Sequence, residues 1–292
     1  MTVIRKLPIG IQDFEKLRTG NFLYVDKTRY LYNLAESGVP YFLGRPRRFG
    51  KSLFLSTLKA YFLGKKELFD GLAIAELEKE WIEYPVIYID LNKASYQSVQ
   101  TLNAVLDAVL MDYEKEWGVE TVSTELSVRF DRVISQAFKK TNRKVVVLID
   151  EYDKPLTGTM DNEKLNDEIR EILRGFYGVL KSADAYLRFV FLTGVTKFSK
   201  VSVFSELNHL KDISMGFRYT GICGITETEL VKYFEPEIKA LADKNSMTRE
   251  EALNRLKTLY DGYHFAKNSD GMYNPFSLLN TFDDMDFGNY WF

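Results

Sequence analysis

Residues 41–62, YFLGRPRRFGKSLFLSTLKAYF, place a lysine and a serine at the spacing of a phosphate-binding loop. The usual pattern is G-x-x-x-x-G-K-[ST], and Gly50, Lys51 and Ser52 fill its last three positions. Its first position holds Arg45, because Gly44 stands one residue too early. In such a loop the lysine reaches the β- and γ-phosphates and the serine binds Mg²⁺. The alternative is an arginine-rich turn before an ordinary helix.

The missing first glycine does not exclude phosphate binding. Its usual task is a tight turn after the strand, and here Pro46 fixes one φ angle while Gly44 supplies freedom just before it. Two further arginines would add positive charge near a phosphate tail. We therefore expect nucleotide contacts from the whole segment: Arg45, Pro46, Arg47, Arg48, Phe49, Gly50, Lys51, Ser52 and Leu53.

A second motif, VVVLIDEYDKP at 145–155, ends an apolar run with acidic residues. In P-loop ATPases an Asp at this point holds the Mg²⁺ shell, which is the role expected for Asp150. A Glu directly after it can orient and deprotonate the attacking water, which makes Glu151 a catalytic candidate beside Lys51. Alone, the pair is equally well explained as solvated carboxylates at a strand end. We assign Asp153 to a turn or a helix cap before Pro155.

A third segment, FVFLTGVTKFS at 189–199, places hydroxyl groups at the end of another apolar run. Thr193 or Thr196 would sense the γ-phosphate or position water there. Threonine is also common at strand ends, so a purely structural role stays open for both.

The elements that must position these residues alternate between strands and helices. Short apolar runs predict strands at 39–43, 85–91, 144–150 and 187–194, and a weaker one at 219–225. Spacings of three and four predict helices at 52–63, 99–117 and 162–181. This alternation predicts an α/β fold with a parallel sheet covered on both faces.

The pattern changes after residue 225. Two helical segments follow, with Thr226 and Thr248 as N-caps and Glu229 and Glu251 three residues later, and no strong strand is expected. We therefore divide the chain into a core at 1–225 and a helical lid at 226–292. The aromatic end DFGNYWF suggests a longer natural protein that continues beyond this point.

Composition narrows the classes of partner. The 292 residues carry a net charge of −2, which gives no global support for nucleic-acid binding, although RPRRF and AFKKTNRK are local basic clusters. A single cysteine makes intramolecular disulfides impossible, and with only two histidines a Cys- or His-rich metal site is improbable. We see neither a secretion signal nor an apolar run long enough for a membrane span. A cytoplasmic protein is the simplest interpretation.

These motifs resemble those of a known family. The chain is similar to the predicted AAA-type ATPase-like family of bacteria and archaea in LPIGIQDFEKLRTGNFLYVDKT, RPRRFGKSLFLSTLKAYF, VVVLIDEYDKPL, LTGVTKFSK and YDGYHF…YNPFSLLN. The resemblance runs from about residue 6 to the end, and RPRRFGKS is the family's usual form of the loop.

The resemblance implies an additional-strand P-loop ATPase, related to the signal-transducing ATPases, with sheet order 5-1-4-3-2 and a lid that could be winged-helix-like. Many relatives continue into a C-terminal domain similar to PD-(D/E)XK nucleases, and the chain ends before any such domain. By analogy, Tyr24, Asp26 and Lys27 would lie near the nucleotide, although packing and helix capping are alternatives. His264 would contact the β-phosphate from the lid, or pack as a loop histidine.

The expected activity is Mg²⁺-dependent ATP hydrolysis coupled to lid or domain movement, with ATP and Mg²⁺ as ligand and cofactor. A nucleotide-gated interaction module with slow hydrolysis is the first alternative. The ATPase part of a nuclease-associated DNA-acting protein is the second, and a small-molecule kinase is a distant further one. Assembly into a homo-oligomer stays open.

Overall fold

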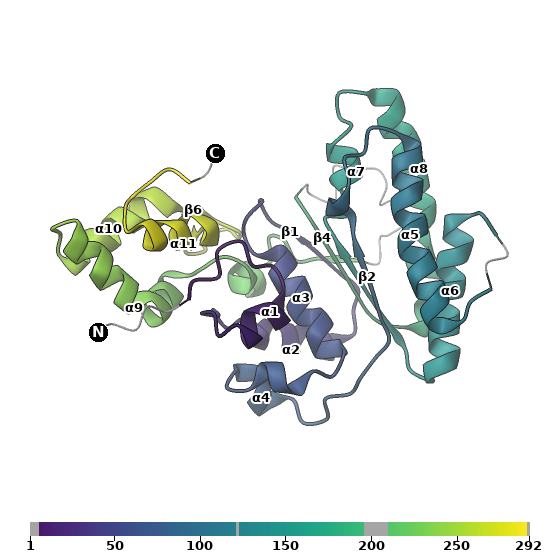
Figure 1. The fold of residues 1–292 in the computed structure, drawn as a ribbon, viewed down its shortest axis with the longest axis horizontal. Helices are drawn as coiled ribbons and strands as arrows, with labels where there is room; N and C mark the ends of the chain where they lie inside the picture. Colours follow the sequence, from purple (N-terminus) through teal and green to yellow (C-terminus); the bar gives the residue numbers. More distant parts are fainter. Residues whose placement is uncertain (1–5, 121–122, 196–209, 291–292) are drawn as a thin grey trace.

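A five-stranded parallel sheet forms the centre of the protein (Figure 1). The computed structural model describes residues 6–120, 123–195 and 210–290. The strand order is β2-β3-β4-β1-β5, and each neighbouring pair is parallel. The strands are β1 (Tyr41–Gly44), β2 (Val86–Asp90), β3 (Val145–Asp150), β4 (Leu187–Gly194) and β5 (Lys211–Asp212).

The first four predicted strands are confirmed, and the fifth is wrong. The run 219–225 lies largely in a 3₁₀ helix, η6 (Phe217–Ile222), and the fifth strand is the short β5 before it. Glycines explain the failure. Gly224 has φ +87°, and a Cβ on Gly221 would lie 2.6 Å from the Tyr30 hydroxyl, so this segment turns where a strand would extend.

Helices cover both faces of the sheet, as the apolar strands predicted (Figure 1). In β3, Val145, Val147 and Ile149 face one apolar core, whereas Val146 and Leu148 face the other. One face is covered by α1 (Phe14–Thr19), α2 (Thr28–Ser37), α3 (Lys51–Phe62) and α4 (Ala73–Leu77). The other is covered by α5 (Val99–Trp117), α6 (Leu126–Thr141), α7 (Lys154–Thr157) and α8 (Glu163–Ser182). Short 3₁₀ helices lie at η1 (Lys66–Phe69), η2 (Leu91–Lys93) and η3 (Asp184–Tyr186).

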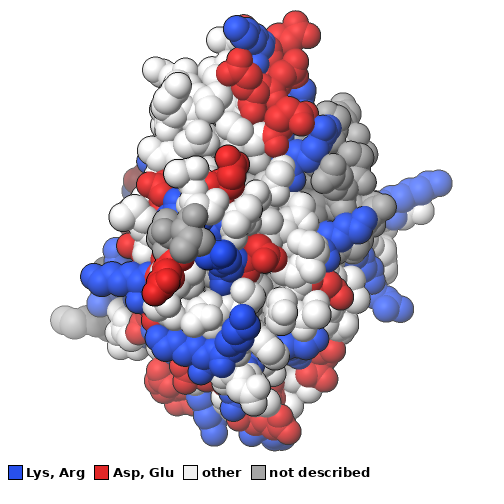
Figure 2. All heavy atoms as spheres, turned by 90° about the vertical axis from the view of Figure 1, so that its right-hand side faces the viewer, with Lys and Arg blue, Asp and Glu red and all other residues white. Residues whose placement is uncertain are grey.

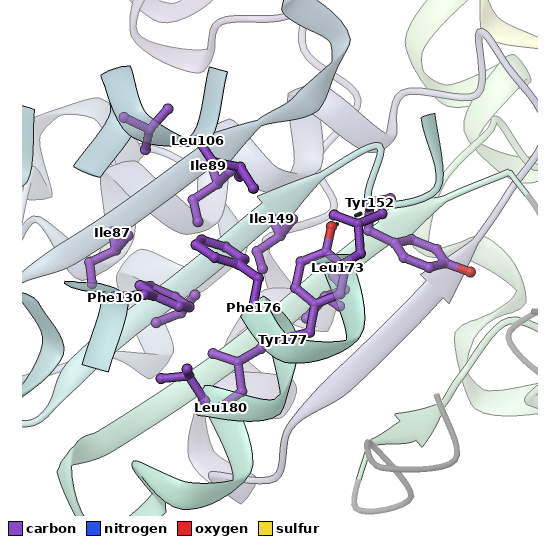
Figure 3. Close-up of a cluster of buried hydrophobic side chains, with 14 of the residues drawn as sticks. Ile87, Ile89, Leu106, Phe130, Ile149, Tyr152, Leu173, Phe176, Tyr177 and Leu180 are labelled. Carbon is purple, nitrogen blue, oxygen red and sulfur yellow. Dashed lines mark hydrogen bonds between the residues drawn. The ribbon is translucent and has the colours of Figure 1, made fainter. Parts of the chain in front are cut away.

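The core beneath α5, α6 and α8 fixes the end of β3, where the acidic motif lies (Figure 3). Phe130 and Phe176 stack with ring centroids 4.5 Å apart, between two of these helices. The Tyr177 hydroxyl donates to the backbone carbonyl of Tyr152 at 3.1 Å, and the Tyr152 ring packs edge-on against Phe42 of β1. The turn after β3 is thereby held by both a helix and the neighbouring sheet.

A C-terminal lobe, residues 225–290, follows the sheet. It contains α9 (Glu227–Lys244), α10 (Arg249–Tyr260), the antiparallel pair β6 (Asp261–Tyr263) and β7 (Met272–Tyr273), and α11 (Pro275–Asp284). Both predicted capping boxes are confirmed, at the starts of α9 and α10. The β6–β7 hairpin was not expected, because its strands are only three and two residues long.

The lobe has its own apolar cluster, which includes Leu230, Phe234, Ile238 and Phe282. Leu7, Ile9, Leu23 and Val25 from the N-terminal segment pack against this cluster. The start of the chain therefore lies between the lobe and the sheet-bearing core. Among the described residues, no helix has the length and apolar character that a membrane crossing needs.

Candidate functional site

A cavity of about 420 Å³ lies where the sheet-bearing core meets the C-terminal lobe. Its walls come from the loop 47–50, the start of α3, the N-terminal segment, residues 222–225 and α11. Glu151 and Lys154, from the turn after β3, border it as well. The cavity thus lies at the carboxyl ends of β1 and β3, which is where open parallel sheets bind their ligands.

Lys51 is held at the start of α3, directly after the turn at Gly50, whose φ is +90°. Its side chain is 3% exposed, and its ammonium lies 3.1 Å from Glu151 Oε1. The same ammonium donates to the carbonyls of Arg45 at 3.0 Å and Pro46 at 3.2 Å. The loop therefore wraps around the lysine, and a single carboxylate oxygen completes its partners.

Asp150 and Glu151 are separated at the end of β3. Asp150 is buried, accepts a hydrogen bond from the Thr193 hydroxyl, and is not among the cavity-lining residues. The chain turns at Glu151, whose φ is +51°, and its backbone N–H donates to Thr193 Oγ1 at 3.2 Å. Thr193, at the end of the neighbouring strand β4, thus holds both acidic residues and fixes their different directions.

Burial raises the pKa of the Glu151 carboxyl, and nearby Lys51 offsets this only in part. A carboxylate that is buried beside one ammonium is a weaker acid than in water, so it accepts a proton more readily. This is the property that a base for water activation needs.

The cavity is strongly cationic. Its lining includes five cationic side chains and one carboxylate, Glu151, which leaves four net positive charges. The cations are Lys27, Arg47, Arg48, Lys51 and Lys154. The rest of the lining is largely apolar, with Ile9, Leu23 and Leu279 among it. A ligand with an anionic tail and a flat apolar end would match this division.

The side chain of Arg45 does not enter the cavity. It is 1% exposed, donates to the carbonyls of Ser214 and Tyr219, and stacks on Phe265 with its guanidinium carbon 4.0 Å from the ring centroid. Pro46 does not line the cavity either. The residue in the first-glycine position therefore anchors the loop to the C-terminal lobe through its side chain, and only its carbonyl serves Lys51.

Arg48 and Phe49 line the cavity and also bind the lobe. Arg48 stacks on Phe276 at 4.3 Å and donates to the Tyr290 carbonyl at 3.0 Å. Phe49 packs edge-on against Tyr263, and its carbonyl accepts from Gly224 N–H at 3.0 Å. The loop that holds Lys51 is thus also the surface on which the lobe rests.

Comparison with known proteins agrees with this arrangement. The family model described as Predicted AAA-ATPase matches residues 8–204. The chain belongs to this family. A relative from Azotobacter chroococcum mcd 1, described as an uncharacterized protein in vnfD 5'region, is 42% identical over 289 residues. These cover 99% of this chain and 54% of the relative, so the chain spans about half of that protein's length. No solved structure matched.

The other predicted residues differ in whether they line this cavity. Tyr24 lines it and is half-buried, and desolvation raises the pKa of its hydroxyl. Lys27 also lines it, and its ammonium contacts both carboxylate oxygens of Glu229 in α9 at 2.6 Å. Asp26 accepts from Thr28 N–H at 2.8 Å and from Ala73 N–H at 2.7 Å, so it caps α2 and joins α4.

His264, which the lid analogy assigned to the β-phosphate, does not line the cavity. His264 is exposed in the β6–β7 hairpin, and its Nδ1 lies 2.8 Å from the Ser269 carbonyl. Thr196 lies outside the described residues. Asp153 occupies the N-cap position of α7, but its carboxylate accepts from Val195 N–H and not from the helix.

Sequence reasoning missed several lining residues. Lys154 stands three positions after Glu151, so the motif itself contained the signal. The segment 8–12 and the turn 222–225 approach the cavity only through the packing of the N-terminus and the lobe, and no local pattern indicates that. Gly50, Ser52 and Leu53 line the cavity as expected from the motif.

Proposed function

We propose that the chain binds ATP in this cavity and hydrolyses it with Mg²⁺. The observation that carries the proposal is the position of Lys51, which starts α3 at the cavity wall and lies 3.1 Å from Glu151. Backbone N–H groups at the start of the helix would receive the phosphates. Net positive charge in the lining then favours a triphosphate over a neutral ligand.

Binding would begin with an exchange of partners at Lys51. Its ammonium now contacts two loop carbonyls and Glu151, and the β- and γ-phosphate oxygens would replace the carboxylate. The released Glu151 would accept a proton from the attacking water while the bond to the γ-phosphorus forms. The bond to the β–γ bridging oxygen breaks in the same step, and ADP leaves with that oxygen.

Mg²⁺ would neutralise charge on the β- and γ-phosphates. Ser52 lines the cavity and offers a hard oxygen ligand, and Asp150, which does not line it, would act through one of the waters that Mg²⁺ keeps. The helix α3 packs on β3, which brings the start of one to the carboxyl end of the other. Among the described residues no group of three or more His, Cys, Asp or Glu forms a metal cage, so Mg²⁺ would arrive with the phosphates.

The sheet supports an additional-strand P-loop core. Counted from β5, its order is β5-β1-β4-β3-β2, the order that the resemblance implied. A further strand, β4, lies between β1, which precedes the loop of Lys51, and β3, which ends at Asp150, and it contributes Thr193. Thr193 would sense the nucleotide state through Asp150 and Glu151.

Movement of the C-terminal lobe would follow nucleotide exchange. The lobe is tied to the cavity wall through Arg48 with Phe276 and through Lys27 with Glu229. Phosphate oxygens would compete for Arg48, because an anion binds a guanidinium more strongly than a ring face or a carbonyl does. At Lys27 they would have to displace the Glu229 carboxylate. Release of these ties would loosen the lobe from the loop.

A nucleotide-gated interaction module with slow hydrolysis is the second candidate. The pairing of Glu151 with Lys51 favours it, because the carboxylate must leave the ammonium before it can serve water. A DNA-acting role gains less support. On the face shown in Figure 2, Lys and Arg side chains are interspersed with Asp and Glu and do not form one basic patch.

The first experiment is to denature the purified chain and identify any nucleotide it releases, then to measure Mg-ATP binding calorimetrically. Lys51→Ala should lose about 100-fold in affinity, since about 2.8 kcal/mol of charged hydrogen bonding disappears. Lys59→Ala, on the exposed face of the same helix, is the control and should bind normally. Unchanged binding by Lys51→Ala would refute the site.

Glu151→Gln separates hydrolysis from binding. It should bind ATP as tightly as the wild type and hydrolyse it at least about 100-fold more slowly. ADP retained by the wild type with a very slow turnover would favour the gated module. Hydrolysis by Glu151→Gln at the wild-type rate would remove Glu151 from the mechanism.

A further inference from the structure

Five cationic side chains line the cavity. Four of them belong to the phosphate loop and the start of α3 or are bound to the C-terminal lobe. Lys51 leads α3, Lys27 is paired with Glu229, and Arg48 is bound to the lobe. Arg47 is exposed in the loop next to them, on the same wall as Lys51. The fifth, Lys154, comes from a different wall and has no role in the mechanism proposed above.

Lys154 is placed by the same turn that places Glu151. Its backbone N–H donates to the Glu151 carbonyl at 2.9 Å, and it is the first residue of α7. Within the described part of the chain, its ammonium makes no hydrogen bond or ion pair. The residue is half-buried and borders the cavity together with Glu151. The turn after β3 therefore holds this ammonium at the rim of the site, where no described acidic residue pairs with it.

Glu151 connects the positions of the two lysines. Its Oε1 lies 3.1 Å from the Lys51 ammonium, and its backbone carbonyl accepts from the Lys154 N–H at 2.9 Å. Lys51 comes from the loop after β1, whereas Lys154 comes from the turn after β3. Both side chains are long and flexible. A γ-phosphate bound to Lys51 from one side would thus face Lys154 on the other, next to Glu151.

We propose that Lys154 is a catalytic residue that contacts the γ-phosphate and supplies, within the same chain, a second positive charge for its transfer. The inference rests on the proposed ATPase function. In phosphoryl transfer, negative charge spreads over the three γ-oxygens, and a cation placed there lowers the barrier. Lys154 takes no proton in this step: Glu151 accepts it from water, and Lys154 only stabilises the charge. Hydrolysis then needs no cation from a second copy of the chain.

The test compares Lys154→Gln with Lys154→Arg, and uses Lys164→Gln in the exposed first turn of α8 as a control. Calorimetry with a non-hydrolysable ATP analogue gives affinity, and single-turnover hydrolysis of Mg-ATP gives the chemical rate over a range of protein concentrations. Lys154→Gln should bind within about threefold of wild type and hydrolyse about 100-fold more slowly. Lys154→Arg should recover most of the rate, and Lys164→Gln should match the wild type. The wild-type rate per molecule should not depend on protein concentration.

Three results would overturn the inference. Hydrolysis by Lys154→Gln at the wild-type rate would show that Lys154 carries no transition-state charge. A loss of affinity as large as the loss of rate would assign Lys154 to binding alone. If the hydrolysis rate per molecule rises with protein concentration and is the same in Lys154→Gln as in the wild type, the cation comes from a neighbouring chain. If the wild type fails to bind Mg-ATP at all, the proposed function itself is wrong and the inference falls with it.

Discussion

Two buried cations of this molecule, Arg129 in α6 and Lys51 at the cavity, are satisfied in different ways. Arg129 donates to both carboxylate oxygens of Glu114, at 2.7 and 2.9 Å, and also contacts Asp107. Lys51 meets one carboxylate oxygen at 3.1 Å and two loop carbonyls. Their side chains are almost equally buried, at 6% and 3% exposure. The difference lies in the partners.

The directions of the pKa shifts show what this difference means. Hydrogen bonds to Glu114 raise the pKa of Arg129 and outweigh its burial. At the cavity burial dominates instead, and the pKa of Glu151 rises although Lys51 opposes the shift. We call the cluster of Arg129, Glu114 and Asp107 closed, because the guanidinium donors of the arginine are matched by two carboxylates. The lysine pair is incompletely satisfied, so a ligand with more negative charge can displace its carboxylate.

The largest effect on stability is expected from removing Arg129 from its cluster with Glu114 and Asp107. Arg129→Met should lower the free energy of unfolding by about 3–5 kcal/mol, because Glu114 would stay buried without a counter-charge. Urea denaturation followed by circular dichroism measures this. Arg132→Met, on the exposed side of the same helix, is the matched control and should change stability by less than about 0.5 kcal/mol.

The cause of that loss can be separated from lost packing. Glu114→Leu combined with Arg129→Met should recover most of the stability, because no buried charge remains unpaired and the side chain of Asp107 is 46% exposed to water. A loss below about 1 kcal/mol in Arg129→Met would contradict the description of this cluster as closed. Whatever its stability, the folded Arg129→Met variant should still bind Mg-ATP, because the cluster does not border the nucleotide cavity.

At Lys51 we expect a small change in stability but a large loss of stabilisation by ATP. Lys51→Met should change the stability of the unliganded protein by no more than about 1 kcal/mol, because the carboxyl of Glu151 that it leaves behind is 16% exposed and already has a raised pKa, so it can be hydrated or take up a proton. Wild-type protein at an ATP concentration 100 times its Kd should gain about 2.7 kcal/mol, and Lys51→Met at the same concentration should gain no more than about 0.4 kcal/mol, because its affinity is about 100-fold lower. Thermal unfolding with and without Mg-ATP measures both. A variant that is destabilised as strongly as Arg129→Met would make Lys51 a structural residue.

The sequence indicated where these groups lie along the chain, but not how their side chains point. Apolar runs located four of the five strands, and the helix at 99–117 matches α5 at both ends, because periodicity and caps are local signals. The fifth strand is two residues long and has no such signal. It is paired only because β1 offers it an edge.

Arg45 shows the limit most clearly. The motif placed it in the phosphate loop, whereas its side chain turns toward Ser214, Tyr219 and Phe265. These partners are about 170 to 220 residues away in the sequence, so only the folded chain reveals them. The cluster of Arg129, Glu114 and Asp107 was missed as well. Glu114 and Asp107 lie on the predicted helix 99–117, but the helix that carries Arg129 was not predicted, and the packing of the two helices is not visible in the sequence.

A smaller effect should appear in the pH dependence of stability. Because the pKa of Glu151 is raised in the folded protein, its contribution is fully present below its ordinary value of 4.5 and is lost as pH rises through the folded-state pKa. Glu151→Gln lacks this dependence, so its stability relative to wild type should increase as pH rises above about 4.5 and then level off. Urea unfolding at a series of pH values measures the difference.

Glu251 is the matched control for this pH dependence. Hydrogen bonds from Thr248 lower the pKa of its carboxyl, so its contribution is present above the ordinary value and is lost as pH falls. Glu251→Gln should therefore lose stability relative to wild type as pH rises, which is the opposite slope. Equal slopes for the two variants would show that the burial of Glu151 does not determine its titration.

The smallest effect is expected from an exposed ion pair that has the same geometry as the buried Arg129–Glu114 pair. Arg249 of α10 holds Glu235 of α9 with two hydrogen bonds, at 2.8 and 2.7 Å, as Arg129 holds Glu114, but this pair is exposed to solvent. Water and salt screen such a pair, and ordering two long side chains offsets most of its attraction. Arg249→Ala should therefore melt within replicate error of the wild type, and any difference should vanish in high salt. A loss approaching that of Arg129→Met would show that bidentate geometry alone stabilises, whereas the small loss expected here would assign the stability of the Arg129 cluster to its burial with complete pairing.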